Sequence, residues 1–108
     1  MRLAWFSPLP PHRSGIAAYS ADVLPALAAR HRIDAYVEGP AAAVLPVPGA
    51  TARDVYDFSW ALPQEAHDLV VYQLGNDVCH DYMWPYMVRH PGLVVMHDAQ
   101  LHQARARA

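Results

Sequence analysis

The chain has 108 residues, of which 54% are apolar, so it is long enough for one small packed domain and too apolar for intrinsic disorder. Its formal net charge is -2 without any basic run, which argues against nucleic acid as a partner. No apolar stretch approaches the roughly 18 residues of a membrane span. Early prolines interrupt any secretion signal, and the single cysteine excludes an internal disulfide framework. We therefore expect a cytoplasmic protein.

Short apolar runs alternate with segments of helical periodicity along the chain. A strand, a helix and a second strand follow one another at its start, which implies a right-handed βαβ unit and a parallel sheet. The predicted fold class is α/β, a Rossmann-like doubly wound parallel sheet of four or five strands. The predicted strands are residues 2–6, 33–37, 54–58 (at an edge), 69–73 and 93–96, and the predicted helices are 16–30 (kinked at Pro25), 78–90 and the residues after 98, with a loop at 39–49 and a helical turn at 59–66.

The first loop leads from a buried strand into the start of a helix. Prolines take the chain out of the sheet after Phe6, and Ser14 followed by Gly15 is typical of a helix N-cap. The unpaired N–H groups that follow attract anions, above all phosphate. The alternative, which the spacing supports equally, is that Gly15 merely permits a sharp turn. One glycine is a far weaker signal than a G-x-G-x-x-G fingerprint, and the G-K-[ST] element of a Walker loop is absent.

Polar residues also follow the two later buried strands, and the carboxyl ends of parallel strands meet at one edge of a sheet. Gly75 and Asn76 end one strand; they could bring backbone close to a ligand, although an ordinary turn is favoured. His97 and Asp98 end the next strand. We interpret His97 as a hydrogen-bond donor to a ligand and Asp98 as a group beside the site or a helix N-cap.

A metal site is an alternative interpretation of the histidines, because imidazole and carboxylate are metal ligands. His97, Asp98 and His102 lie close together in the sequence, and His80-Asp81 forms a second such pair. Neighbouring residues of a strand point to opposite faces, however, and the H-x-x-x-H spacing of helical zinc sites is absent. We therefore expect no metal, and a metal-dependent hydrolase is the least favoured of the functions considered.

With these residues in view, most of the chain apart from residues 38–66 resembles the N-terminal part of a family 4 glycosyltransferase of the two-domain GT-B fold. The segments that carry the resemblance are RLAWFSPLPPHRSGIAAYS, DLVVYQLGNDVCHDYMWPYMVRHPGLVVMHD and the HDAQLH end. The opening strand followed by SGIA-Y-S and the later GN…H…HPG-x-V-x-x-HD run are the more specific parts.

The resemblance implies two Rossmann-like domains that face each other across a cleft, the N-terminal one holding mainly the acceptor. It implies that Gly15 approaches the donor phosphates or the transferred sugar and that His97 lies beside the reacting sugar. Transfer would retain the anomeric configuration and need neither a metal ion nor a cofactor, since the nucleotide sugar is a substrate. The family's donor-binding Arg/Lys pair and its E-x7-E element have no match in residues 1–108.

Residues 1–108 would accordingly be a truncated acceptor-side domain whose C-terminal donor-binding domain is missing, and inactive by themselves. The complete protein would transfer a sugar from a nucleotide-sugar donor to a carbohydrate or lipid-linked acceptor. A lipid-linked acceptor would bring it to the inner face of the membrane as a peripheral protein. The alternative is a stand-alone flavodoxin-like binding or regulatory module without catalysis.

Overall fold

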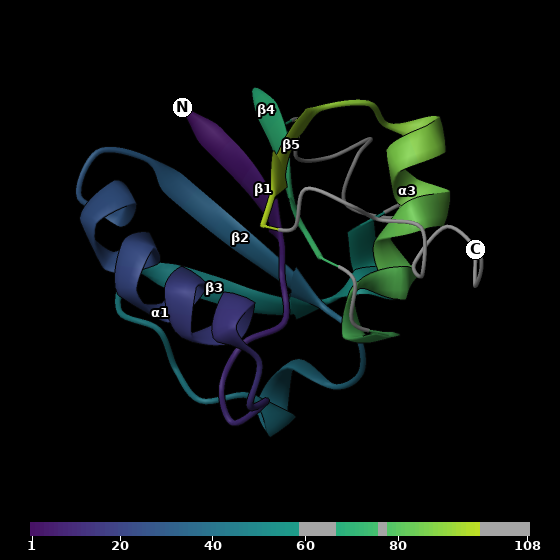
Figure 1. Cartoon of the computed structure of the whole chain (residues 1–108). Helices are drawn as coiled ribbons and strands as arrows, with labels where there is room; N and C mark the ends of the chain where they lie inside the picture. Colours follow the sequence, from purple (N-terminus) through teal and green to yellow (C-terminus); the bar gives the residue numbers. More distant parts are fainter. Residues whose placement is uncertain (59–66, 76–77, 98–108) are drawn as a thin grey trace.

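A computed structural model, which describes residues 1–58, 67–75 and 78–97, shows a five-stranded sheet in which every strand pair is parallel (Figure 1). The strand order is β3-β2-β1-β4-β5, so the predicted α/β class with a Rossmann-like parallel sheet is confirmed. The strands are β1 Arg2–Phe6, β2 Arg32–Val37, β3 Ala50–Asp54, β4 Leu69–Leu74 and β5 Leu93–Met96; the helices are α1 Gly15–Ala28 and α3 Trp84–Arg89, with 3-10 turns η1 Ala41–Ala43, η2 Val55–Asp57 and η3 Val78–Met83.

The sheet is covered on both faces because alternate residues of its central strands point to opposite sides. Leu3 and Trp5 of β1 pack on the side of α1, together with Leu24 of that helix. Ala4 and Phe6 pack on the other side, under the residues of η2, η3 and α3. Figure 1 shows α1 and α3 on either side of the strands. The two faces explain why β1 and β4 read as continuous apolar runs in the sequence.

Helix α1 is a single helix, as predicted, and it continues past Pro25 to Ala28. Ser14 caps its start, because the Ser14 Oγ accepts a hydrogen bond from the N–H of Ala17 at 3.0 Å. A proline inside a helix removes one backbone hydrogen bond. Burial of the preceding Leu24, which is fully enclosed, helps to offset that loss.

Two of the predicted elements differ from the structure. The third strand is Ala50–Asp54 rather than residues 54–58, although it does lie at a sheet edge. Asp54 ends the strand because its Oδ1 accepts from the N–H of Tyr56 at 3.1 Å and starts the 3-10 turn η2. The predicted helix over residues 78–90 is a 3-10 turn followed by α3, and Pro85 lies in the first turn of α3, where a missing N–H costs nothing. The predicted turn at 59–66 and the helix after residue 98 fall outside the described residues.

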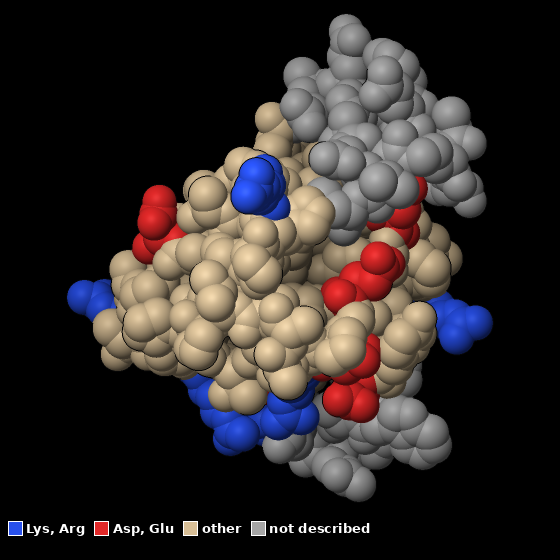
Figure 2. All heavy atoms as spheres, turned by 90° about the horizontal axis from the view of Figure 1, so that it is seen from below, with Lys and Arg blue, Asp and Glu red and all other residues tan. Residues whose placement is uncertain are grey.

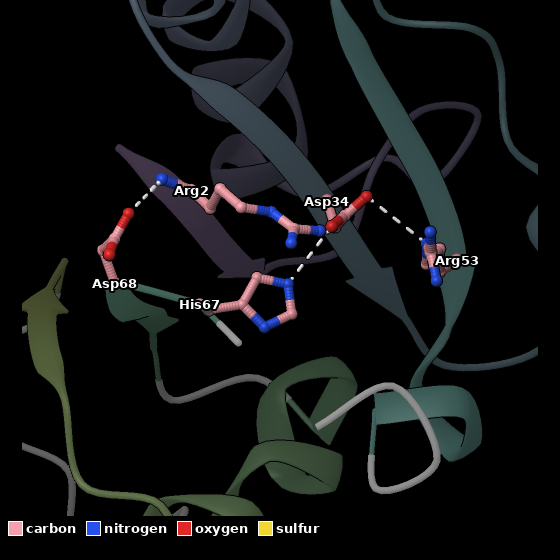
Figure 3. Close-up of polar contacts among 5 residues, drawn as sticks. All are labelled: Arg2, Asp34, Arg53, His67 and Asp68. Atoms are coloured by element: carbon pink, nitrogen blue, oxygen red, sulfur yellow. Dashed lines mark hydrogen bonds and ion pairs between the residues drawn. The ribbon is translucent and has the colours of Figure 1, made fainter. Parts of the chain in front are cut away.

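Strand β2 carries a buried carboxylate, Asp34, on the α3 side of the sheet (Figure 3). Asp34 is 2% exposed. Its Oδ2 lies 3.1 Å from His67 Nε2, and its Oδ1 lies 3.3 Å from Arg53 Nε. Figure 3 shows the Arg2 side chain extending from β1 toward the same carboxylate. Nothing in the sequence pattern pointed to this cluster, because its members are far apart along the chain.

Burial also changes the acidity of Tyr72, which is fully enclosed in β4 and whose hydroxyl donates to the carbonyl of His90 at 2.6 Å. Desolvation raises the pKa of Tyr72 from 10.0 to about 12. Between these two pH values the phenol ionises in the unfolded chain but stays protonated in the folded one. The unfolded chain then binds fewer protons, so the free energy of unfolding falls as the pH rises.

We therefore expect the protonated phenol of Tyr72 to contribute fully to the free energy of unfolding below pH 10. This contribution is lost as the pH rises through about 12, at roughly 1.4 kcal/mol per pH unit. Burial also raises the pKa of Tyr86, with Tyr56 and Asp54 acting in the same direction and Arg89 against it. Denaturant unfolding over this pH range checks the expectation. Tyr72→Phe should flatten the slope, and an unchanged slope in that variant would assign the alkaline loss to other groups.

Candidate active site

The strand order reverses between β1 and β4, because the chain runs outward to β2 and β3 on one side and to β4 and β5 on the other. In parallel α/β sheets, ligands bind at the carboxyl ends of the strands beside such a switch point. Helix α1 begins there, directly after the loop that leaves β1. Of the predicted site residues, those that the structure describes (Ser14, Gly15, Gly75 and His97) therefore belong to the part of the fold where a ligand is expected.

A chain of buried hydrogen bonds fixes the start of α1 against the end of β1. Trp5 Nε1 donates to Ser20 Oγ at 3.0 Å, and Ser7 Oγ donates to the carbonyl of Pro8 at 2.7 Å. The two serine oxygens lie 2.7 Å apart. Because the only hydroxyl proton of Ser7 goes to Pro8, Ser20 must donate to Ser7. The sequence alone did not single out Ser20, which is fully buried and links strand to helix.

Gly15 is the first residue of α1 and is exposed. A Cβ added to it would meet no atom of the described residues within 4 Å. Its backbone needs no glycine either, because positive φ among the glycines of the described part occurs at Gly39 and Gly49 only. Ser14 acts as the helix cap, as predicted. The structure therefore shows neither a packing nor a conformational requirement for glycine at position 15.

The packing around position 75 explains why this residue is glycine. A Cβ on Gly75 would lie 2.8 Å from Ile16 Cδ1 of α1 and 3.1 Å from Nε2 of the buried His80. The end of β4 is thus packed tightly between α1 and η3, and a larger residue would have to push them apart. This supports the interpretation of Gly75 as a structural turn more than as a ligand contact. Asn76, its predicted partner, lies outside the described residues.

His97 follows β5 and is held by three contacts. Its Nε2 lies 2.7 Å from Gln73 Oε1, and its backbone N–H donates to the carbonyl of Leu74 at 3.0 Å. The ring of Tyr19, one turn into α1, meets the imidazole edge-on with centroids 4.8 Å apart. His97 as a residue is exposed at this edge, whereas Gln73 is fully buried. Asp98 lies outside the described residues.

These contacts show how far the predicted site residues come together. The first turns of α1 touch both later strand ends, Gly75 through Ile16 and His97 through Tyr19. Sequence patterns missed Gln73 and Tyr19; the one available signal was a lone amide in the otherwise apolar strand LVVYQL. The predicted ligand contacts of Ser14, Gly15 and His97 stay predictions.

The carboxyl edge of the sheet also carries a hollow of about 540 Å³ beside the loop that leads to Gly15. Pro8, His12 and Glu38 are among the residues that line it. Figure 2 shows the molecule from below: much of the visible face is uncharged, basic residues lie in its upper middle and at its lower edge, and most of the visible acidic residues gather on its right side. Within residues 1–58, 67–75 and 78–97, no group of three or more His, Cys, Asp or Glu could hold a metal ion. The same residues include no helix long and apolar enough to cross a membrane.

Comparisons with protein-family models, curated proteins and solved structures found no match for this chain.

Proposed function

We propose that this chain forms the acceptor-side domain of a family 4 glycosyltransferase of the GT-B fold. The complete protein would transfer a sugar from a nucleotide sugar to a carbohydrate or lipid-linked acceptor, with retention and without a metal ion or cofactor. The observation that carries the proposal is the exposed Gly15 at the start of α1, where neither packing nor backbone conformation calls for glycine. The resemblance of its surroundings to the glycosyltransferase segments supports the same assignment.

In this proposal Gly15 lets the donor approach the start of α1. A side chain there would stand between the helix and the ligand, whereas glycine leaves the first N–H groups accessible. These groups and the positive end of the helix dipole stabilise the negative charge that develops on the leaving diphosphate. His97, at the neighbouring strand end, would lie beside the transferred sugar.

The two domains would each supply part of the positive charge that stabilises the diphosphate of the donor. In this proposal the domain offers the N-terminus of α1 to the diphosphate. A diphosphate carries more charge than one helix terminus balances, since that terminus is equivalent to about half an elementary charge. The cations would come from the donor-binding domain, where the resemblance expects an Arg/Lys pair.

The acceptor would enter from the other side of the same loop. The hollow beside Pro8 combines apolar walls with Glu38 and His12. Carboxylate and imidazole groups accept hydrogen bonds from sugar hydroxyls, and apolar walls suit the hydrophobic face of a sugar ring. Under this proposal the acceptor and the donor meet near Gly15.

Backbone-amide NMR of the chain, titrated with a panel of nucleotide sugars, tests the proposal. We expect at least one of them to shift the signals of Gly15, Ile16, Tyr19 and His97, and Gly15→Val to remove these shifts. Signals that stay unshifted at this edge at saturating concentrations, or that shift only elsewhere, would favour a binding or regulatory module instead.

A further inference from the structure

Gln73 is an amide buried completely in the core of a parallel sheet. It shares its face of β4 with Val71, which belongs to the hydrophobic cluster beneath α1. Burying an amide among apolar side chains costs free energy unless it forms hydrogen bonds. The amide of Gln73 has two polar atoms. Its Oε1 has a hydrogen-bond partner in His97, whereas its buried Nε2 has no hydrogen-bond partner among the described residues. The contact with His97 is therefore what Gln73 gains at this position.

That contact determines where the imidazole proton lies. The Gln73 amide is oriented with Oε1 toward the ring, and an amide oxygen only accepts hydrogen bonds; in this orientation the Nε2 of His97 carries the hydrogen that it shares with Gln73 at 2.7 Å. A neutral imidazole has one N–H, so Nδ1 is left with its lone pair. No described residue bonds to Nδ1, and His97 as a residue is exposed at the carboxyl edge.

We propose that Gln73 is a positioning residue that holds His97 as the Nε2–H tautomer and presents its Nδ1 lone pair to a ligand hydroxyl. The backbone bond to Leu74 fixes the main chain of His97, and Tyr19 packs edge-on against its ring. In the neutral state His97 then accepts a hydrogen bond from its ligand, rather than donating one as the sequence suggested. Identifying that ligand as a sugar rests on the proposed function; the tautomer does not.

Nitrogen NMR of the histidine side chains, recorded on the ligand-free chain above the pH at which histidines are charged, measures the tautomer directly. The spectrum of His97→Ala identifies the His97 signals among those of the seven histidines. We expect His97 to show one neutral form with the hydrogen on Nε2. A hydrogen on Nδ1, or an average of the two forms, would overturn the proposal.

Three variants separate positioning from general damage to the core. Gln73→Leu, which removes the acceptor, should replace the single form with an average of both tautomers. Gln73→Glu keeps an accepting oxygen at the same reach and removes the unpartnered N–H groups, so it should retain the Nε2–H form. Val71→Ala creates a cavity on the same face without touching His97 and should also leave the tautomer unchanged.

A fixed Nε2–H form in Gln73→Leu would contradict the proposal. If that variant does not fold, the spectra of the unmodified chain and of Gln73→Glu still decide the matter. A failure of the proposed function would look different, since sugars would not bind although the tautomer stayed fixed.

Discussion

If the proposed function holds, replacing Gly15 with valine is expected to lower glycosyl-transfer turnover of the complete protein by about 100-fold or more while the domain stays folded. The valine side chain would stand where the proposal brings the donor to the start of α1, and it would displace the phosphate or the sugar from the helix N–H groups. Because a Cβ at this position meets no described atom within 4 Å, we expect the free energy of unfolding to change by less than about 1 kcal/mol. Steady-state kinetics and denaturant unfolding of the same preparation measure the two effects.

A graded series makes the test sharper. Gly15→Ala adds only the Cβ and should cost less turnover than valine does. Ala26→Val also introduces valine, by adding two methyl groups, at an exposed position near the other end of α1, away from the strand ends, and should leave turnover unchanged. Equal turnover in Gly15→Val and in Ala26→Val would remove Gly15 from the site.

Replacing Asp34 with alanine is expected to have the largest effect on stability. The substitution leaves Arg53 and the buried His67 without their shared carboxylate partner. Removing one partner of a buried ion pair costs about 3–5 kcal/mol, and we expect a loss near the lower figure because the Arg53 side chain is 28% exposed. For a domain of this size, that corresponds to a fall in melting temperature on the order of 15 °C.

The position of His67 adds to the effect. Its ring stacks on Phe58 with centroids 5.9 Å apart and meets Tyr36 edge-on. Losing the carboxylate therefore disturbs both the polar cluster and the aromatic packing on the α3 side of the sheet. Thermal unfolding followed by circular dichroism measures the change. Asp22→Ala, which removes an exposed carboxylate from α1, should cost almost nothing, and an equally small loss in Asp34→Ala would show that the cluster contributes little.

The sequence predicted those elements of the fold that produce a recognisable pattern of neighbouring residues. The central strands β1 and β4 are buried on both faces and so read as apolar runs, and α1 combines helical spacing with a serine cap. The edge strand β3 was predicted at residues 54–58 instead of 50–54 because ATARD is partly exposed along its length and gives no apolar run. The strand is held by its register with β2, from Ile33 opposite Ala50 to Val37 opposite Asp54. Edge strands are determined by pairing more than by burial.

The sequence likewise predicted only some features of the candidate site. Gly15 and His97 could be singled out because they follow strands and stand at turns. Their surroundings could not, since the contact between Gln73 and His97 and that between Asp34 and His67 join residues far apart in the sequence. The role of Gly75 also needed the structure, because only the packing of Ile16 and His80 around it explains a glycine there.

The most direct test of the proposed function is release of nucleoside diphosphate by the complete gene product, incubated with a panel of nucleotide sugars and candidate acceptors. The proposal predicts that at least one donor yields nucleoside diphosphate together with a glycosylated acceptor, without added metal, and that Gly15→Val lowers the rate of formation of both products by about 100-fold or more. A folded protein that releases no nucleoside diphosphate from any donor, or whose release is the same in Gly15→Val, would contradict it.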